Sequence, residues 1–132
     1  MNADALNLIG RIFLALLFLT SGAAKIMDYQ GVSQYMAGAN MPMIQIALPI
    51  AIAMEIGGAL GLILGFQTRL AALVLVVYTV VASWFFHNFW ALSGQEAQMQ
   101  MIQFTKNLAL IGGLLVVMAA GAGRLSIDGR RR

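Results

Sequence analysis

Residues 43–66 read MIQIALPIAIAMEIGGALGLILGF, an apolar stretch with one acid, Glu55, near its middle. The hydrocarbon core of a bilayer is about 30 Å thick and takes about 20 helical residues to cross. This stretch is therefore long enough to be a transmembrane helix. A carboxylate at such depth costs about 3 kcal/mol even on insertion scales that are lenient to charge. We therefore expect Glu55 to have a partner inside the protein.

Three further apolar stretches cover residues 6–27, 70–86 and 101–122. Hydrophobic residues make up 61% of the 132 and charged residues 10%, whereas a soluble domain carries about 25% charged residues. Lipid offers no partners to unpaired backbone groups, which favours helices. The sequence predicts an all-α, polytopic membrane protein whose four transmembrane helices form a single domain, residues 1–132, in the lipid bilayer. The first connection is expected to hold a short interfacial helix at residues 32–36.

The basic residues indicate the orientation. Arg11, Arg69, Arg124 and the three terminal arginines 130–132 fall on one side of the four spans, and only Lys25 and Lys106 fall on the other. Cations flanking spans are enriched on the cytoplasmic side. We expect a multi-pass protein of the bacterial inner membrane with both termini in the cytoplasm. Because the net charge of +3 comes from these flanking positions, no nucleic-acid partner is expected.

Counting residues from these arginines gives the depth of the other charges. Lys25 lies 14 positions after Arg11, and Glu55 lies 14 positions before Arg69. At 1.5 Å per residue both are about 21 Å from the arginine plane. The sequence therefore predicts a buried ion pair between Lys25 and Glu55, with Trp84 at the same depth.

A second polar layer follows at about 27 Å, where His87 and Lys106 are each 18 positions from an arginine. Asn88 and Asn107 adjoin them. We expect a polar pocket in the outer half of the bundle, bordered by Glu55, Trp84, His87 and Lys106.

Each of these polar residues also has an alternative interpretation as a purely structural residue. Lys25 and Lys106 could extend to the outer interface, His87 could belong to an aromatic belt, and a Lys25–Glu55 pair could simply hold two helices together. The glycines at 57, 61 and 65 are typical of close helix packing, within the bundle or in a homodimer. The chain has no cysteine and one histidine, a poor set of transition-metal ligands, so no metal site is expected.

Several motifs occur in order along the spans. They are RI at 11–12, SGAAKIM at 21–27, MEIGG at 54–58, LGFQTR at 64–69, FHNFW at 86–90 and FTKNL at 104–108. In this order they resemble the DoxX family of small four-span bacterial membrane proteins, over nearly the whole chain. The resemblance implies the four-helix fold and a link to membrane redox and oxidative-stress complexes.

Our first hypothesis is a component of a quinone-linked redox system. Glu55 and His87 would be the catalytic residues that pass protons. Lys25, Trp84, Asn88, Lys106 and Asn107 would bind the quinone, and a redox partner protein would supply electrons. Whether the chain is an enzyme, such as a quinone-reactive oxidoreductase subunit, is left open. The alternatives are a non-enzymatic anchor or assembly partner for a redox protein, and a lipid or small-solute binder or transporter.

Overall fold

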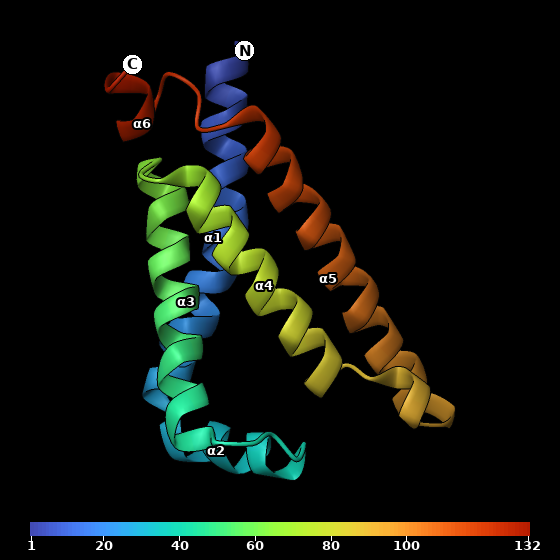
Figure 1. Cartoon of the computed structure of the whole chain (residues 1–132). Coiled ribbons are helices and arrows are strands. Elements are labelled where there is room, and N and C mark those ends of the chain that lie inside the picture. Colours follow the sequence, from blue (N-terminus) through green and yellow to red (C-terminus); the bar gives the residue numbers. More distant parts are fainter.

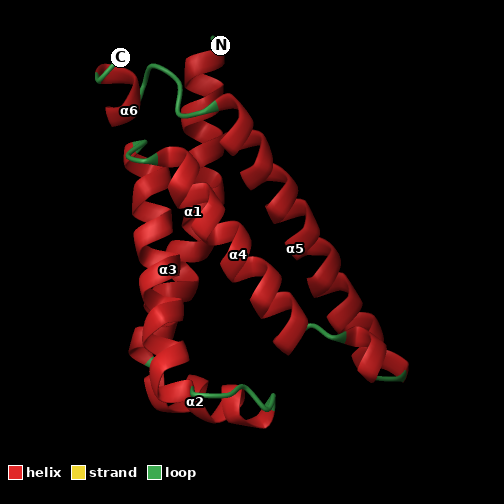
Figure 2. Cartoon of the chain, viewed as in Figure 1, coloured by secondary structure: helices red, strands yellow, loops and turns green.

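The structure, a computed structural model, describes all 132 residues, and all of its regular structure is helical (Figures 1 and 2). The elements in chain order are α1 (Ala3–Met27), α2 (Tyr29–Gly38), α3 (Ile44–Leu64), α4 (Thr68–Phe86), the 3-10 helix η1 (Phe89–Ala91), α5 (Gly94–Ala120) and α6 (Ile127–Arg130). Four of them, α1, α3, α4 and α5, are long and apolar enough to cross a membrane. The predicted all-α fold and the number of spans are confirmed.

Two helices are longer than their apolar patterns. α5 begins at Gly94 rather than at 101, because the polar turn that precedes the apolar stretch continues the same helix. The connecting helix α2 covers residues 29–38 rather than 32–36. Its start is fixed by the Asp28 carboxylate, which accepts a hydrogen bond from the Gly31 amide at 3.2 Å. Hydropathy indicates how much of a helix meets lipid, whereas capping groups set where the helix begins.

The helices pack as a chain of neighbours: α1 lies against α3, α3 against α4, and α4 against α5. Both termini and the α3–α4 turn lie at one end, which we call the terminal end (Figure 1). The opposite end, which we call the loop end, holds α2 and η1. Toward it α4 and α5 diverge from α1 and α3, and α2 lies across the bottom of the pair formed by α1 and α3 (Figure 1).

Glycines allow close approach at the centre of the bundle. A side chain at Gly22 on α1 would collide with Ile56 on α3, and one at Gly58 would collide with Leu75 on α4. Gly57 has open space beside it. Within the bundle, the predicted close packing is therefore present at Gly61, which faces Ala71, and at Gly65, which faces Ser126, and a homodimer contact stays a prediction for Gly57.

Arg11 joins three segments at the terminal end. It is fully buried, and its guanidinium donates to the carbonyls of Leu62 at 2.7 Å and Leu125 at 2.6 Å. A third bond reaches the Asn7 side chain at 2.8 Å. Arg11 therefore caps the C-terminal turn of α3 and holds the segment after α5, a role beyond the interfacial marker that its position predicts.

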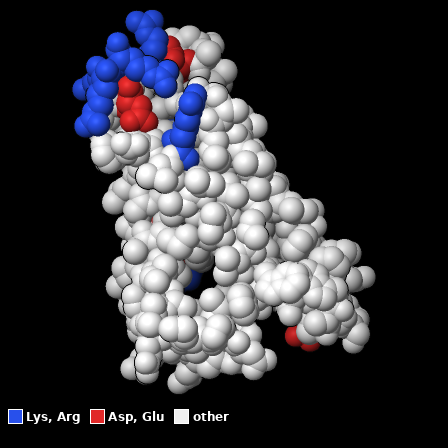
Figure 3. All heavy atoms as spheres, in the orientation of Figure 1, with Lys and Arg blue, Asp and Glu red and all other residues white.

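Asp128 fastens the C-terminal segment to the start of α4. Its carboxylate accepts hydrogen bonds from the amides of Gln67 and Thr68 at 3.0 and 2.9 Å, and from the Thr68 hydroxyl at 2.8 Å. Burial by itself would raise the pKa of Asp128, but these hydrogen bonds, together with the charge of Arg131, outweigh it and hold the pKa below its ordinary value. On the face shown in Figure 3, most of the visible basic side chains gather at this same end, and the sides of the long helices show almost no charge.

Candidate functional site

The predicted ion pair is present. Lys25 on α1 and Glu55 on α3 meet with 2.9 Å between Nζ and Oε2. Glu55 is 1% exposed, whereas the side chain of Lys25 is 19% exposed. Oε2 of Glu55 accepts no hydrogen bond of ordinary angular geometry, so its contact with Lys25 is ionic. The carboxylate is thus sealed inside the bundle behind the lysine.

Two hydroxyl groups complete the surroundings of this pair. The Lys25 ammonium donates to the Ser21 hydroxyl at 2.8 Å, one helical turn earlier on α1. It also lies 5.7 Å from the centre of the Tyr78 ring on α4, a cation–π distance. The Tyr78 hydroxyl lies near Glu55 and Ser21. Three helices therefore contribute to one polar cluster, which we call the Lys25 cluster: Ser21, Lys25, Glu55 and Tyr78.

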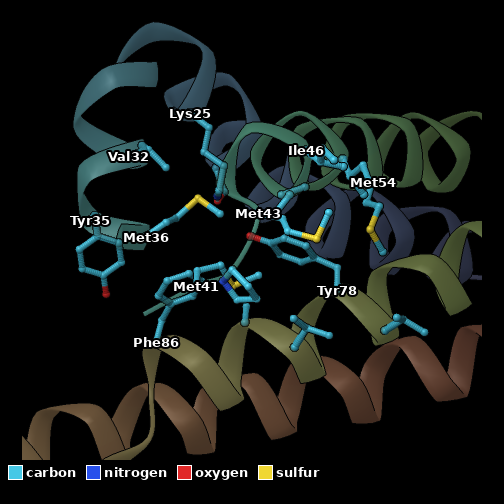
Figure 4. A pocket seen from close by; sticks show the side chains of 18 of the residues that line it. Lys25, Val32, Tyr35, Met36, Met41, Met43, Ile46, Met54, Tyr78 and Phe86 are labelled. Carbon is cyan, nitrogen blue, oxygen red and sulfur yellow. The ribbon is translucent and has the colours of Figure 1, made fainter. Parts of the chain in front are cut away.

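A cavity of about 720 Å³ adjoins this cluster at the loop end. Sixteen of its twenty lining residues are hydrophobic, and they come from α1, α2, α3, α4 and the segment that joins α2 to α3. Lys25 and Tyr78 are directed into it from α1 and α4, with the side chains of α2 on a third side (Figure 4). The space-filling view is hollowed on this face between α3 and α4 (Figure 3).

Methionines form much of the cavity wall. Four of the nine in the chain line it, at positions 36, 41, 43 and 54 (Figure 4). Met36 on α2 is 4% exposed, and its neighbour Tyr35 stacks on Phe86 of α4, with 5.3 Å between ring centres. The wall is therefore polarizable and adaptable, because methionine side chains repack easily around ligands of varied shape.

His87 lines the same cavity at the end of α4. Its Nδ1 lies 2.7 Å from the Oε1 oxygen of Gln100 on α5. The histidine therefore joins the far side of the cavity to the helix behind it. Lys25 and His87, two of the predicted site residues, do share one cavity, and Glu55 lies directly behind its wall.

Trp84 and Lys106 do not border this cavity, which corrects the predicted outline. Trp84 is 64% exposed and packs against Trp90, with 5.3 Å between ring centres. Lys106 is exposed on α5. Depth counting fixes the height of a residue but not its direction around the helix. His87 follows the end of α4 at Phe86, so its direction does not continue the helical spacing of Trp84.

Asn88 and Asn107, the two predicted asparagines, also lie outside the cavity wall. Asn107 on α5 donates to the Ser83 hydroxyl on α4 at 2.9 Å, so it links these helices rather than lining the cavity. Asn88 is half-buried and precedes η1, where its carbonyl accepts from the Ala91 amide at 3.0 Å. Neither side chain faces the cavity wall formed by Lys25 and His87.

Sequence reasoning missed Tyr78 and Gln100. Tyr78 lies nine positions from Arg69, which places its backbone well short of the depth of Glu55. Gln100 falls in the connection before the fourth apolar stretch, which concealed its place on α5. A signal for Gln100 was available in the polar residues at 100, 103 and 107, which recur at helical spacing.

The cavity carries little net charge. The ammonium of Lys25 is compensated by Glu55, and this is the one ion pair of the chain. Lys106 lies outside the cavity and adds no charge to its wall. The arrangement can hold a largely apolar ligand whose small polar head lies between Lys25, Tyr78 and His87.

Two proteins of Escherichia coli resemble the chain over most of its length. The chain is 37% identical over 125 residues to inner membrane protein YphA of Escherichia coli, covering 95% of this chain and 89% of that one. It is 36% identical over 121 residues to inner membrane protein YqjF of the same organism, covering 92% and 88%. A more distant match, 28% over 81 residues, is to the ER-derived vesicles protein ERV29 of Saccharomyces cerevisiae, covering 61% of this chain and 26% of that one.

No solved structure matches the chain. The DoxX family model matches residues 6–88, which contain α1 to α4 with Lys25, Glu55, Tyr78 and His87. The two Escherichia coli matches extend over nearly the full length of both proteins. This chain therefore belongs to the DoxX family.

Proposed function

We propose that this protein is an inner-membrane component of a quinone-linked redox system, with a quinone-type lipid bound in the cavity beside the Lys25 cluster. The observation that carries the proposal is the composition of that cavity: a wall of mostly apolar side chains with the polar atoms of Lys25, Tyr78 and His87. Its volume of about 720 Å³ lies within the usual range of small-molecule sites.

The residues present fit a quinone-type head group. The apolar wall, rich in methionine, suits an isoprenoid tail. The few polar groups of the wall can fix the orientation of a quinone ring. Because Lys25 is compensated by Glu55, the site favours a neutral head group over an anion. When bound, a quinone would supply the electron chemistry, and a partner or soluble reductant would supply the electrons.

Proton movement at this site would use the chain's own groups. His87 lines the cavity and is suited to exchanging a proton there. Glu55 is 1% exposed and paired with Lys25, so it is less accessible to a proton from the cavity than His87 is. We therefore assign direct proton exchange with the ligand to His87 and a supporting role in proton transfer to Glu55.

We also propose the orientation in which the terminal end is cytoplasmic and the cavity lies in the outer half of the inner membrane. The arginines at the terminal end support it, since flanking cations are enriched on the cytoplasmic side. Two relatives are named as inner membrane proteins. Alkaline phosphatase fused to the C-terminus should be inactive, and periplasmic activity would contradict this orientation.

Titration of the purified protein in nanodiscs with a fluorescent or radiolabelled quinone analogue tests the ligand. We expect saturable binding, and binding of the reduced, quinol form of the analogue should weaken at least about tenfold, roughly 1.4 kcal/mol, in His87→Ala. Lys106→Ala is the matched control and should bind as the wild type does, because Lys106 is exposed away from the cavity. Absence of binding by the wild type would refute the proposal.

The second candidate is a non-enzymatic anchor or assembly partner for a redox protein. The Lys25–Glu55 pair favours this second candidate. Its two charges neutralise each other, so the pair can hold α1 and α3 together without any ligand. Full complementation of a deletion strain by the Glu55→Gln, His87→Ala double variant would support this second function over the first.

A further inference from the structure

The bond between His87 and Gln100 determines which hydrogen-bonding group the histidine offers to the cavity. Nδ1 of His87 lies 2.7 Å from the Oε1 oxygen of Gln100. An amide oxygen only accepts hydrogen bonds, so Nδ1 must carry the hydrogen and donate it. Gln100 therefore selects the Nδ1–H tautomer of the ring.

The other ring nitrogen is then an acceptor. In a neutral imidazole one nitrogen donates and the other accepts. No carboxylate is paired with His87, since the one ion pair of the chain joins Lys25 to Glu55. The bond to Gln100 is also the one hydrogen bond that the His87 side chain makes within the protein. Nε2 is thus an acceptor with no protein partner, on a residue that lines the cavity.

The other polar groups of the cavity lie together in the Lys25 cluster. The Lys25 ammonium contacts Ser21 and Glu55, and the Tyr78 hydroxyl lies near the same two residues. The free hydrogen-bonding capacity of the cavity on the His87 side is therefore that of a proton acceptor.

We propose that Gln100 is a specificity-determining residue, which holds His87 so that its Nε2 accepts a hydrogen bond from a hydroxyl group of the bound ligand. This inference rests on the proposed function and sharpens it. The cavity selects a hydroxyl-bearing, membrane-soluble molecule, such as the reduced, quinol form of a quinone, over the quinone itself. A quinone presents only carbonyl oxygens, which accept hydrogen bonds and meet no donor at Nε2.

The tautomer can be observed directly. His87 is the single histidine of the chain, so protein labelled with ¹⁵N-histidine gives one pair of ring nitrogen signals. We expect a protonated Nδ1 and an unprotonated Nε2 in the wild type, and a mixture of tautomers in Gln100→Leu. Gln103→Leu is the matched control, because Gln103 is exposed on the same helix and should leave the signals unchanged. A wild-type ring protonated at Nε2, alone or together with Nδ1, would overturn the inference.

Binding of four probes to the same samples tests the selectivity. They are a short-chain quinol, its dimethyl ether, the matching quinone, and a long-chain alcohol of similar size. We expect the wild type to bind the quinol about tenfold more tightly than the ether or the quinone, as one hydrogen bond provides. In Gln100→Leu this preference should fall to less than about threefold, and in Gln103→Leu it should persist.

The outcomes separate the two claims. Equal binding of quinol, ether and quinone by the wild type, or an unchanged preference in Gln100→Leu, would overturn the hydroxyl selectivity and leave the proposed function standing. A long-chain alcohol that binds as tightly as the quinol would uphold the hydroxyl selectivity and overturn the quinone-type ligand. Binding of none of the four would overturn the proposed function and this inference together.

Discussion

The two ends of the bundle are built in opposite ways. At the terminal end, Arg11 and Asp128 tie α3, the α3–α4 turn and the C-terminal segment together through side-chain bonds to backbone groups. At the loop end, the helices diverge around a cavity, and one ion pair is the main polar link between α1 and α3. The comparison indicates that the terminal end fixes the fold and that the loop end is free to hold a ligand.

The difference lies in how the helix ends are capped by side chains. The last carbonyls of α3 and the first amides of α4 have no helical partners, and Arg11 and Asp128 satisfy them. Helices also end in the loop half, but α3 and α5 begin there without a side-chain cap. Side chains there can instead surround an open volume.

The largest effect should come from breaking the ion pair of the loop half. Lys25→Met or Glu55→Ala alone leaves one buried charge without its partner, and each should cost about 3–5 kcal/mol of unfolding free energy. The double variant Lys25→Met, Glu55→Met should cost less than either single change. Reversible unfolding in mixed micelles measures this, and single variants within about 1 kcal/mol of the wild type would show that the pair is not buried in the membrane.

A smaller loss is expected from Arg11→Lys at the terminal end. The guanidinium reaches the carbonyls of Leu62 and Leu125 at once, which a lysine ammonium, a single point charge, cannot do. Loss of one charged hydrogen bond should cost about 2 kcal/mol. Arg69→Lys, at an exposed arginine of the same end, is the control and should be nearly neutral. Binding of ligands at the loop end should survive Arg11→Lys, and its loss would show that the two ends are coupled.

The sequence was sufficient for the features that depend on length along a helix. The four spans follow from the apolar stretches, and the Lys25–Glu55 pair follows from counting residues to flanking arginines. Direction around a helix was not available in the same way. Trp84 shares the predicted depth of Glu55 yet is turned outward against Trp90. That direction depends on which helices are neighbours, and the chain order leaves their arrangement open.

The cavity itself could not be predicted for a related reason. It exists because α4 diverges from α3 toward the loop end and because α2 folds across that end (Figure 1). Both features are tertiary, since α2 is placed by contacts such as the stacking of Tyr35 on Phe86. The methionines that line it read in sequence as ordinary packing residues.

Gly57 and Gly58, two adjacent glycines at the middle of the bundle, differ in how closely they pack against other helices. Gly58→Ala places a methyl group against Leu75 and should cost about 1–3 kcal/mol through overpacking. Gly57→Ala, one position away, meets open space and should change unfolding free energy by less than about 0.5 kcal/mol. The same unfolding assay compares the two variants. If Gly57→Ala instead dissociates an oligomer in sedimentation analysis, Gly57 belongs to a homodimer interface.

The smallest expected effect is the pH dependence that Asp128 gives the terminal end. Its pKa is held below the ordinary value by the amides of Gln67 and Thr68 and by the Thr68 hydroxyl, in spite of burial. A carboxyl group with a lowered pKa in the folded state stabilises the fold fully above its ordinary pKa, and this stabilisation is lost as pH falls through the lowered one. Stability should therefore fall more steeply between pH 6 and pH 3 in the wild type than in Asp128→Asn, which lacks the titrating group.

At neutral pH the Asp128→Asn variant should itself be about 1 kcal/mol less stable, the usual cost of weakening the cap at a helix start. Unfolding measured at both pH values tests this, because the deficit of the variant relative to the wild type should shrink at pH 3, where the wild-type carboxylate loses its stabilising charge. Asp4→Asn is a useful comparison, since Asp4 accepts a bond from the Arg124 amide at the same end but does not hold the start of α4. Parallel pH profiles for the wild type and Asp128→Asn would mean that the carboxylate is not held as the structure shows. The terminal end would then owe its rigidity to Arg11 alone.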